Sequence, residues 1–207
     1  MKCEFCRDNI KEVLSFENIF SKKEKLILCN NCKKYLDINI ITVGEYELYY
    51  FCDYEFVKEI IYKIKYFGDV QSAIKFKILF NKFFELYNFD LVTIVPSNNT
   101  RKYIRGFNHI EEICKLCDVK FESTLACDYR EKQSKLHKKR TIHNFEVLTE
   151  FKQNSKEFKN ILIMDDIFTS GNTLVSCAKK LEQYLPNLKI SFLTLAKSGE
   201  KMDKKEG

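Results

Sequence analysis

Two consecutive stretches of the chain, 56–68 and 70–87, carry apolar residues every three or four positions, which is the spacing of one helix face. The repeating positions are Ile60, Ile61, Ile64, Phe67, Ile74, Ile78, Leu79 and Phe83. Gly68 and Asp69 stand between the two stretches and are typical of a helix end followed by a new start. The pattern therefore predicts two helices.

Short apolar runs bounded by turn residues predict strands in the rest of the chain. They are an aromatic-rich run at 46–55, a β-branched run that ends at Pro96, a buried-type run at 160–164 and a final run at 189–197. Amphipathic patterns predict further helices near 108–113 and over 174–185, the latter ending near Pro186. Strands alternating with helices predict the α/β class, with a mostly parallel sheet flanked by helices.

Residues 1–45 show no sustained period and are dominated by cysteine pairs and lysines. A segment with so little apolar material needs a cross-link, such as a bound metal, to hold its fold. We therefore expect a small module over 1–45 ahead of an α/β domain over 46–207. The 207 residues suffice for one such domain and an appendage. We expect a flexible tail from about residue 199.

Composition fits a folded protein, with 45% hydrophobic and 31% charged residues. No apolar stretch is long enough to span a membrane, and the N-terminus lacks the apolar core of a signal peptide. We therefore expect a cytoplasmic protein, in which nine cysteines favour metal binding over disulfides. The formal charge of +6 favours polyanionic partners but does not distinguish nucleic acid from a phosphorylated metabolite.

Cys3 and Cys6 form one CxxC pair, and Cys29 and Cys32 form a second after 22 intervening residues. This spacing is typical of four-cysteine zinc sites, in which a complete set of thiolates makes the zinc structural. Ordinary reduced cysteines, or a redox pair, are the alternatives. The third pair, Cys114 with Cys117, falls in a helical pattern and is interpreted as buried apolar residues. We assign no chemistry to the other three cysteines, Cys52, Cys127 and Cys177.

Residues 160–173 read NILIMDDIFTSGNT: an apolar strand, two carboxylates, a small polar turn and a helix start. Backbone N–H groups of such a turn and of a helix N-terminus bind phosphate, and hydroxyls add donors. The candidate phosphate residues are Thr169, Ser170, Gly171, Asn172 and Thr173. Asp165 and Asp166 could accept hydrogen bonds from sugar hydroxyls or hold Mg²⁺. A capped helix after a buried strand is the alternative.

This run resembles the ribose-phosphate motif of type I phosphoribosyltransferases. The resemblance implies that Asp165 and Asp166 hold the ribose of phosphoribosyl pyrophosphate (PRPP) with Mg²⁺, and that 169–173 bind its 5′-phosphate. It also implies that the loop after Pro96 faces the pyrophosphate. That loop contributes Ser97, Asn98, Arg101 and Lys102.

Further segments resemble the competence protein ComF family, described as a four-cysteine zinc finger fused to a phosphoribosyltransferase-like domain. They are Lys65–Asp69, Arg105–Asn108, the stretch from Arg130 through Gln133 to Arg140, and Asn144 with Phe145. The family resemblance implies a role in DNA uptake during natural transformation. His109 departs from the usual Gln after RGFN, and the loop after Pro96 lacks the usual second proline.

Residues 129–143 contain six Lys or Arg against one acid, interleaved with a tyrosine and two histidines. Such a segment can follow a nucleic-acid backbone. The candidate DNA-binding residues are Arg105, Arg130, Lys132, Lys135, Lys138, Lys139 and Arg140. A loop that closes over reactants, or a merely solvated loop, would also be basic.

Two functions therefore stand as predictions. The first is a protein that binds PRPP and single-stranded DNA and handles incoming DNA, with DNA-uptake machinery at the inner membrane as a further partner. The second is an active phosphoribosyltransferase on an unidentified acceptor, for which the sequence identifies no nucleobase-binding residues or general base. A nucleotide-salvage enzyme with an incidental zinc finger is a third alternative.

Overall fold

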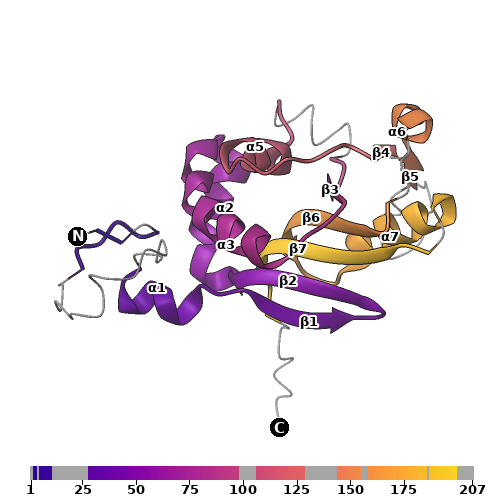
Figure 1. Ribbon diagram of the computed structural model, residues 1–207. Helices are drawn as coiled ribbons and strands as arrows, with labels where there is room; N and C mark the ends of the chain where they lie inside the picture. The colour runs from indigo at the N-terminus through magenta and orange to yellow at the C-terminus, as the bar shows by residue number, and fades with distance from the viewer. Residues whose placement is uncertain are drawn as a thin grey trace, which may run out of the picture.

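A five-stranded sheet in the order β1-β2-β7-β6-β3 forms the centre of the protein (Figure 1). The computed structural model describes residues 2–3, 5–10, 28–97, 106–128, 144–154, 158–185 and 187–199. The strands are β1 (Asn39–Val43), β2 (Tyr46–Asp53), β3 (Leu91–Ile94), β6 (Asn160–Phe168) and β7 (Lys189–Lys197). Strands β2, β7, β6 and β3 are parallel to one another, and β1 alone in this sheet is antiparallel. The predicted α/β class is confirmed as a mixed, mostly parallel sheet flanked by helices.

Strand β1 is not predicted by the sequence pattern. It pairs with β2 from Asn39↔Tyr50 to Val43↔Tyr46 and is joined to it by Gly44 and Glu45. Gly44 has a φ of +63°, which a two-residue hairpin turn requires. The strand has only five residues and none of them is buried, so its pattern is too short to identify and only the pairing with β2 makes it a strand. Residues assigned to the N-terminal module thus contribute the edge of the central sheet.

One face of the sheet is covered by helices that all precede β4 in the chain (Figure 1). They are α2 (Tyr54–Phe67), η2 (Val70–Phe76), α3 (Lys77–Leu86) and α5 (His109–Leu116), with α1 (Asn30–Tyr35) beside them. The first predicted helix is confirmed, and its C-cap is Gly68, whose φ is +67°. The prediction of a single helix over 70–87 is wrong, because its first part is a 3₁₀-helix. Three residues per turn place Ala73 and Phe76 on one line, and both are fully buried.

The other face is covered by α7 (Asn172–Tyr184), the two-stranded ribbon of β4 (Leu125–Asp128) with β5 (Asn144–Val147), and α6 (Thr149–Asn154). Neither β4 nor β5 is predicted by the sequence pattern. The ribbon buries Leu125, Phe145 and Val147 against this face. Each strand is only four residues long, so its pattern is too short to predict a strand.

Strand β6 continues four residues beyond its predicted end, because its pairing with β7 runs to Phe168↔Lys197. Asp165 and Asp166 therefore lie within the strand and not in the loop after it. Ile161 and Ile163 pack on the α7 face, whereas Leu162 and Met164 pack on the α2 face. Because successive strand residues point to opposite faces, this alternation directs the two acids to different sides of the sheet.

Within the described residues, no helix is both long and apolar enough to cross a bilayer.

Candidate functional site

The four predicted metal ligands meet at the N-terminal end of the molecule. The sulfurs of Cys3, Cys6, Cys29 and Cys32 all lie within 4.8 Å of one another. Four Zn–S bonds of about 2.3 Å would separate the sulfurs by about 3.8 Å, and the Cys6–Cys29 separation is 3.6 Å. This geometry is compatible with a structural zinc held by a full set of thiolates.

Two local turns present these cysteines. In the first, the N–H of Arg7 donates to the carbonyl of Cys3 at 3.0 Å, and Arg7 adopts a φ of +69°. In the second, Cys29 caps α1, and its sulfur accepts from the N–H of Cys32 at 3.4 Å. Each CxxC pair is thus held by backbone contacts that do not depend on the rest of the fold.

Aromatic side chains attach this cysteine cluster to the sheet domain. Phe5, between the first two cysteines, stacks on Phe56 of α2 with ring centroids 5.8 Å apart. Tyr35 at the end of α1 also stacks on the ring of Phe56, with ring centroids 5.0 Å apart. Phe5 also meets Phe76 edge-on at 5.7 Å, so the module shares the core of the α2 face.

The third CxxC pair is part of the core, as predicted. Cys114 and Cys117 are fully buried, and the thiol of Cys117 donates to the carbonyl of Ala73 at 3.3 Å. Burial raises the pKa of both thiols to about 12. Since the thiolate is the form that binds metals and reacts, these two residues act as small apolar side chains.

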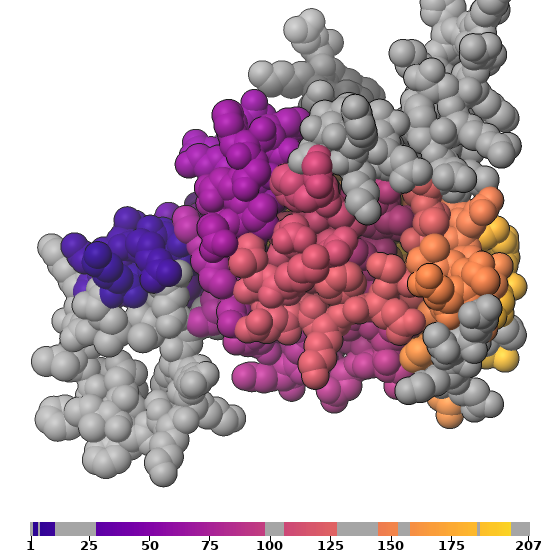
Figure 2. All heavy atoms as spheres, turned by 90° about the horizontal axis from the view of Figure 1, so that it is seen from above, coloured from indigo at the N-terminus to yellow at the C-terminus, as the bar shows by residue number. Residues whose placement is uncertain are grey.

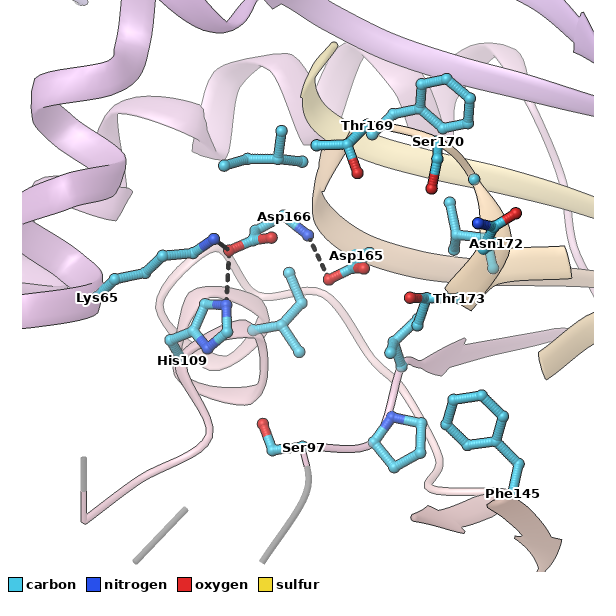
Figure 3. A pocket seen from close by; sticks show the side chains of 17 residues that line it. Lys65, Ser97, His109, Phe145, Asp165, Asp166, Thr169, Ser170, Asn172 and Thr173 are labelled. Carbon is cyan, nitrogen blue, oxygen red and sulfur yellow. Dashed lines mark hydrogen bonds and ion pairs between the residues drawn. The ribbon is translucent and has the colours of Figure 1, made fainter. Parts of the chain in front are cut away.

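A cavity of about 280 Å³ opens at the carboxyl ends of β3 and β6 and at the N-terminus of α7 (Figure 3). This edge of a parallel sheet is where α/β proteins bind ligands. The structure brings most of the predicted ligand residues to this cavity. Its lining includes Ser97, Asp165, Asp166, Thr169, Ser170, Gly171, Asn172 and Thr173.

Gly171 determines the shape of the loop between β6 and α7. Its φ is +74°, and a Cβ at this position would lie 2.7 Å from Cε2 of Phe168 and 3.2 Å from Cγ1 of Val43. A glycine is therefore required by both the backbone conformation and the packing beneath the loop. Because Gly171 provides no side-chain cap to α7, the first N–H groups of this helix can donate to a ligand.

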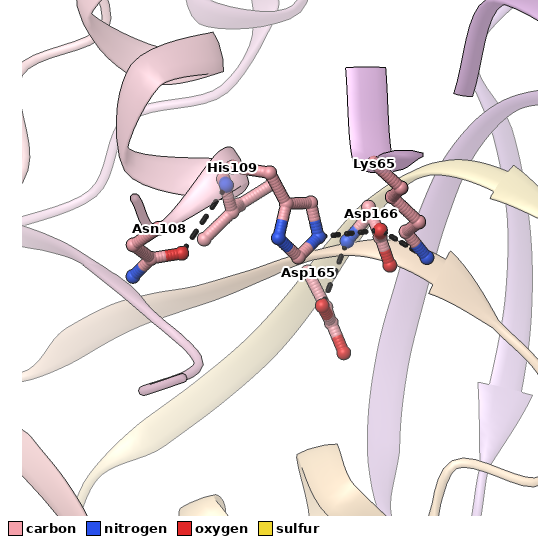
Figure 4. A network of polar contacts seen from close by, with 6 residues as sticks. Lys65, Asn108, His109, Asp165 and Asp166 are labelled. Atoms are coloured by element: carbon pink, nitrogen blue, oxygen red, sulfur yellow. Dashed lines mark hydrogen bonds and ion pairs between the residues drawn. The ribbon is translucent and has the colours of Figure 1, made fainter. Parts of the chain in front are cut away.

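The Asp166 carboxylate is fixed by two side chains from separate helices (Figure 4). Its Oδ2 contacts the ammonium of Lys65 from α2 and lies 2.6 Å from Nε2 of His109 at the start of α5. Burial alone would raise the pKa of Asp166, but the hydrogen bond from His109 and the charge of Lys65 outweigh it and hold the pKa well below its usual range. An ionised carboxylate can only accept, so Nε2 of His109 carries the proton that it donates.

Asp165 has a different environment from that of its neighbour. Its carboxylate accepts the backbone N–H of Asp166 at 2.8 Å. Burial and the negative charge of Asp166 raise the pKa of Asp165 well above its usual range. The pair therefore combines one firmly ionised carboxylate with one that takes up a proton readily in the absence of a ligand.

Sequence reasoning did not assign Lys65, His109 or Phe145 to this site, although all three line the cavity. Lys65 and Phe145 lie in segments that carry the family resemblance, and His109 directly follows one of them, which was the available signal. No spacing rule could connect Lys65 or His109 to Asp166, because the contact spans 101 and 57 positions of the chain.

The other predicted site residues lie outside the described part of the chain. In the loop after Ser97 these are Asn98, Arg101 and Lys102. Among the DNA-binding candidates they are Arg105, Arg130, Lys132, Lys135, Lys138, Lys139 and Arg140. Their roles stay predictions from the sequence.

Competence protein ComFC of Bacillus subtilis strain 168 is 27% identical to this chain over 205 residues, which cover 95% of the chain and 84% of that protein. This relative confirms the resemblance to the ComF family. The match includes both the cysteine module and the sheet domain. Protein-family models give no match. Among solved structures, a xanthine-guanine-hypoxanthine phosphoribosyltransferase of Helicobacter pylori covers 63% of this chain and 85% of its own, at a TM-score of 0.41 and 15% identity.

Proposed function

We propose that the cavity at the end of β6 binds the ribose 5-phosphate part of PRPP. The observation that carries this proposal is the convergence of two carboxylates, a hydroxyl-rich loop and an uncapped helix N-terminus on one cavity. Carboxylates accept from vicinal hydroxyls, and the N-terminal N–H groups of α7 donate to phosphate. A phosphorylated sugar presents both kinds of group on one small molecule.

The 5′-phosphate would lie against the loop from Thr169 to Thr173. Thr169 and Ser170 are exposed and Thr173 is half-buried, so their hydroxyls can reach a ligand. The ribose would then meet Asp165 and Asp166, which lie between this loop and Ser97 in Figure 3. Ser97 and the residues after it would face the pyrophosphate.

Magnesium fits the donor set at this end of the cavity. Mg²⁺ in nucleotide sites is commonly held by one or two carboxylates together with ligand phosphate oxygens, and Asp165 and Asp166 provide such carboxylates. Bound there, it would neutralise charge on the pyrophosphate.

We further propose that the protein is a ComF-type competence protein that handles incoming single-stranded DNA in the cytoplasm. The likeness to Competence protein ComFC along nearly the whole chain supports this role. The basic segment at 129–143 supplies the charge needed for contacts with a phosphodiester backbone. The DNA-uptake machinery at the inner membrane would be its partner in that role.

Calorimetric titration of the zinc-loaded protein with PRPP and Mg²⁺ tests the ligand. We expect micromolar binding that is lost in the Asp165→Asn, Asp166→Asn double variant, since amides accept more weakly than carboxylates and cannot hold Mg²⁺ as well. Folded wild-type protein that binds no PRPP would refute the proposal.

Fluorescence anisotropy with single-stranded DNA tests the second binding activity. Charge reversal at Lys138, Lys139 and Arg140 should weaken DNA binding and flatten its salt dependence, while leaving PRPP affinity unchanged. The acid double variant should show the opposite pattern. Loss of both activities from either change, in folded protein, would mean that the two ligands share one surface.

A phosphoribosyltransferase remains the second candidate, because both acids of the motif are present and line the cavity. That activity would release pyrophosphate from PRPP when the acceptor is supplied. Incubation with purine bases, pyrimidine bases and single-stranded DNA, with pyrophosphate as the readout, separates a transferase from a binding protein.

A further inference from the structure

We propose that Lys65 and His109 are positioning residues that fix the Asp166 carboxylate in the orientation needed to bind the ribose hydroxyls. This inference rests on the proposed ribose 5-phosphate site and assigns it two residues from helices outside the β6–α7 motif. It makes recognition of the sugar depend on α2 and α5, whereas recognition of the phosphate depends on the loop before α7.

The geometry of the contacts carries the argument. Lys65 and His109 both contact the same oxygen, Oδ2, so the carboxylate plane is fixed from two directions. Among the described residues no side chain is found to donate to the second oxygen, Oδ1, so that oxygen can accept from a ligand in the cavity. In Figure 3 the two donors approach Asp166 from the side away from Asn172 and Thr173, so they do not stand between the carboxylate and the phosphate loop.

Burial strengthens the effect of these contacts on the carboxylate. The side chains are 18% exposed for Lys65, 11% for His109 and 8% for Asp166, so all three are largely shielded from water. On the surface, such an ion pair would contribute little to the orientation of the carboxylate. A buried carboxylate that lost one of its two donors would rotate or take up a proton. Lys65 also offsets the charge of Asp166, which allows a second acid to stand beside it in the strand.

The helices hold both donors in place. Ile61 lies one turn before Lys65 and Ile64 directly beside it, and both are buried; α2 ends two residues later at Phe67, with Gly68 as its C-cap. His109 is the first residue of α5, where the side chain of Asn108 accepts the N–H of Ile110 at 3.3 Å. The positions of Lys65 and His109 are thus set by packing and capping and not by Asp166 alone.

Titration calorimetry with ribose 5-phosphate and, separately, inorganic phosphate tests the proposal. Both ligands use the phosphate loop, but only the sugar uses Asp166, so their affinity ratio measures sugar recognition. We expect Lys65→Met to lower this ratio about tenfold or more, since a hydrogen bond to a charged group is lost, with phosphate affinity unchanged. Lys65→Arg and His109→Gln keep a donor and should restore the ratio. Lys63→Met, at an exposed position of the same helix, is the matched control.

A double-mutant cycle separates positioning from direct contact. In an Asp166→Asn background, Lys65→Met should have no further effect on the ratio, because its action passes through that carboxylate. A continuing effect there would show that Lys65 touches the ligand and would overturn the inference. An equal loss of affinity for both ligands in Lys65→Met, or an unchanged affinity ratio, would overturn the inference as well.

Circular dichroism establishes which variants fold, and His109→Ala replaces Lys65→Met as the test if the latter does not. A wild-type protein that binds phosphate but shows no preference for ribose 5-phosphate would instead refute the proposed function, and the inference with it. The two failures are distinguishable, because failure of the inference alone appears only in the variants, whereas failure of the proposed function appears already in the wild-type protein.

Discussion

The four-cysteine cluster and the cavity at the end of β6 both arise from short sequence motifs, yet they differ in how their polar groups are satisfied. In the cluster, four sulfurs within 4.8 Å of one another form a complete ligand set for one ion. In the cavity, the hydroxyls of 169–173 and the N–H groups of α7 face an open volume of about 280 Å³. A complete set is suited to holding a structure together, and an open set is suited to an external ligand.

The two regions also differ in how local they are. The cysteine pairs are positioned by turns and one short helix, whereas the cavity takes its lining from α2, the residues after β3, α5, β5, β6 and α7. Damage to the cluster should therefore appear as loss of structure, and damage to the cavity as loss of binding. The following predictions test that distinction, from the largest expected effect to the smallest.

Removing the metal should have the largest effect. Cys32→Ser, or a strong chelator, should abolish zinc binding and unfold the N-terminal module, because zinc contributes about 10–16 kcal/mol in small zinc-binding units. Zinc content per chain and thermal unfolding are the measurements. Cys114→Ala with Cys117→Ala is the control and should retain zinc with only a modest loss of stability. Retention of zinc by Cys32→Ser would contradict the ligand assignment.

Gly171→Ala should impair both stability and binding. Its left-handed conformation costs an L-residue about 1–2 kcal/mol, and the added methyl would also displace the Phe168 ring. We expect phosphate affinity to fall more than tenfold. Titration calorimetry measures the affinity, and urea unfolding measures the loss of stability. Gly44→Ala is a close match, with a φ of +63° but no atom within 4 Å of the added Cβ. It should show the conformational cost alone, with unchanged phosphate affinity.

Phe56→Ala should loosen the attachment of the cysteine module to α2. Its ring stacks on both Phe5 and Tyr35, and aromatic pairs contribute about 0.5–1.5 kcal/mol each beyond their burial. We expect a loss of about 2 kcal/mol in the free energy of unfolding and faster zinc release to a chelator. Ligand affinity in the cavity should not change. Tyr62→Ala, at an exposed position of the same helix, should leave zinc release as in the wild type.

Thr173→Val should have the smallest effect, and only on binding. It replaces one half-buried hydroxyl at the phosphate loop by a methyl of similar size. Loss of one hydrogen bond of about 1 kcal/mol predicts roughly fivefold weaker phosphate binding, with stability nearly unchanged. Ser176→Ala removes a hydroxyl that donates within the same helix, to the carbonyl of Asn172, and should bind phosphate normally. Equal weakening in both variants would place the phosphate elsewhere.

The cysteine cluster could be predicted completely from the sequence because its spacing is itself the structural requirement. The carboxylates and the phosphate loop could be predicted for the same reason, since strand, turn and helix follow one another without interruption. The residues that surround Asp166 could not be predicted from the sequence. The ends of α2 and α5 reach that carboxylate only because both helices pack on the same face of the sheet.

Sequence alone determined the class of fold and the residues of its two motifs, because these depend on local periodicity and on contiguous spacing. It did not determine that 39–43 would be a strand or that 70–76 would be a 3₁₀-helix, since both follow from the neighbours against which they pack. Tertiary structure also decided that Asp165 and Asp166 differ. Alternation along β6 directs them to opposite faces, and only the α2 face brings Lys65 and His109.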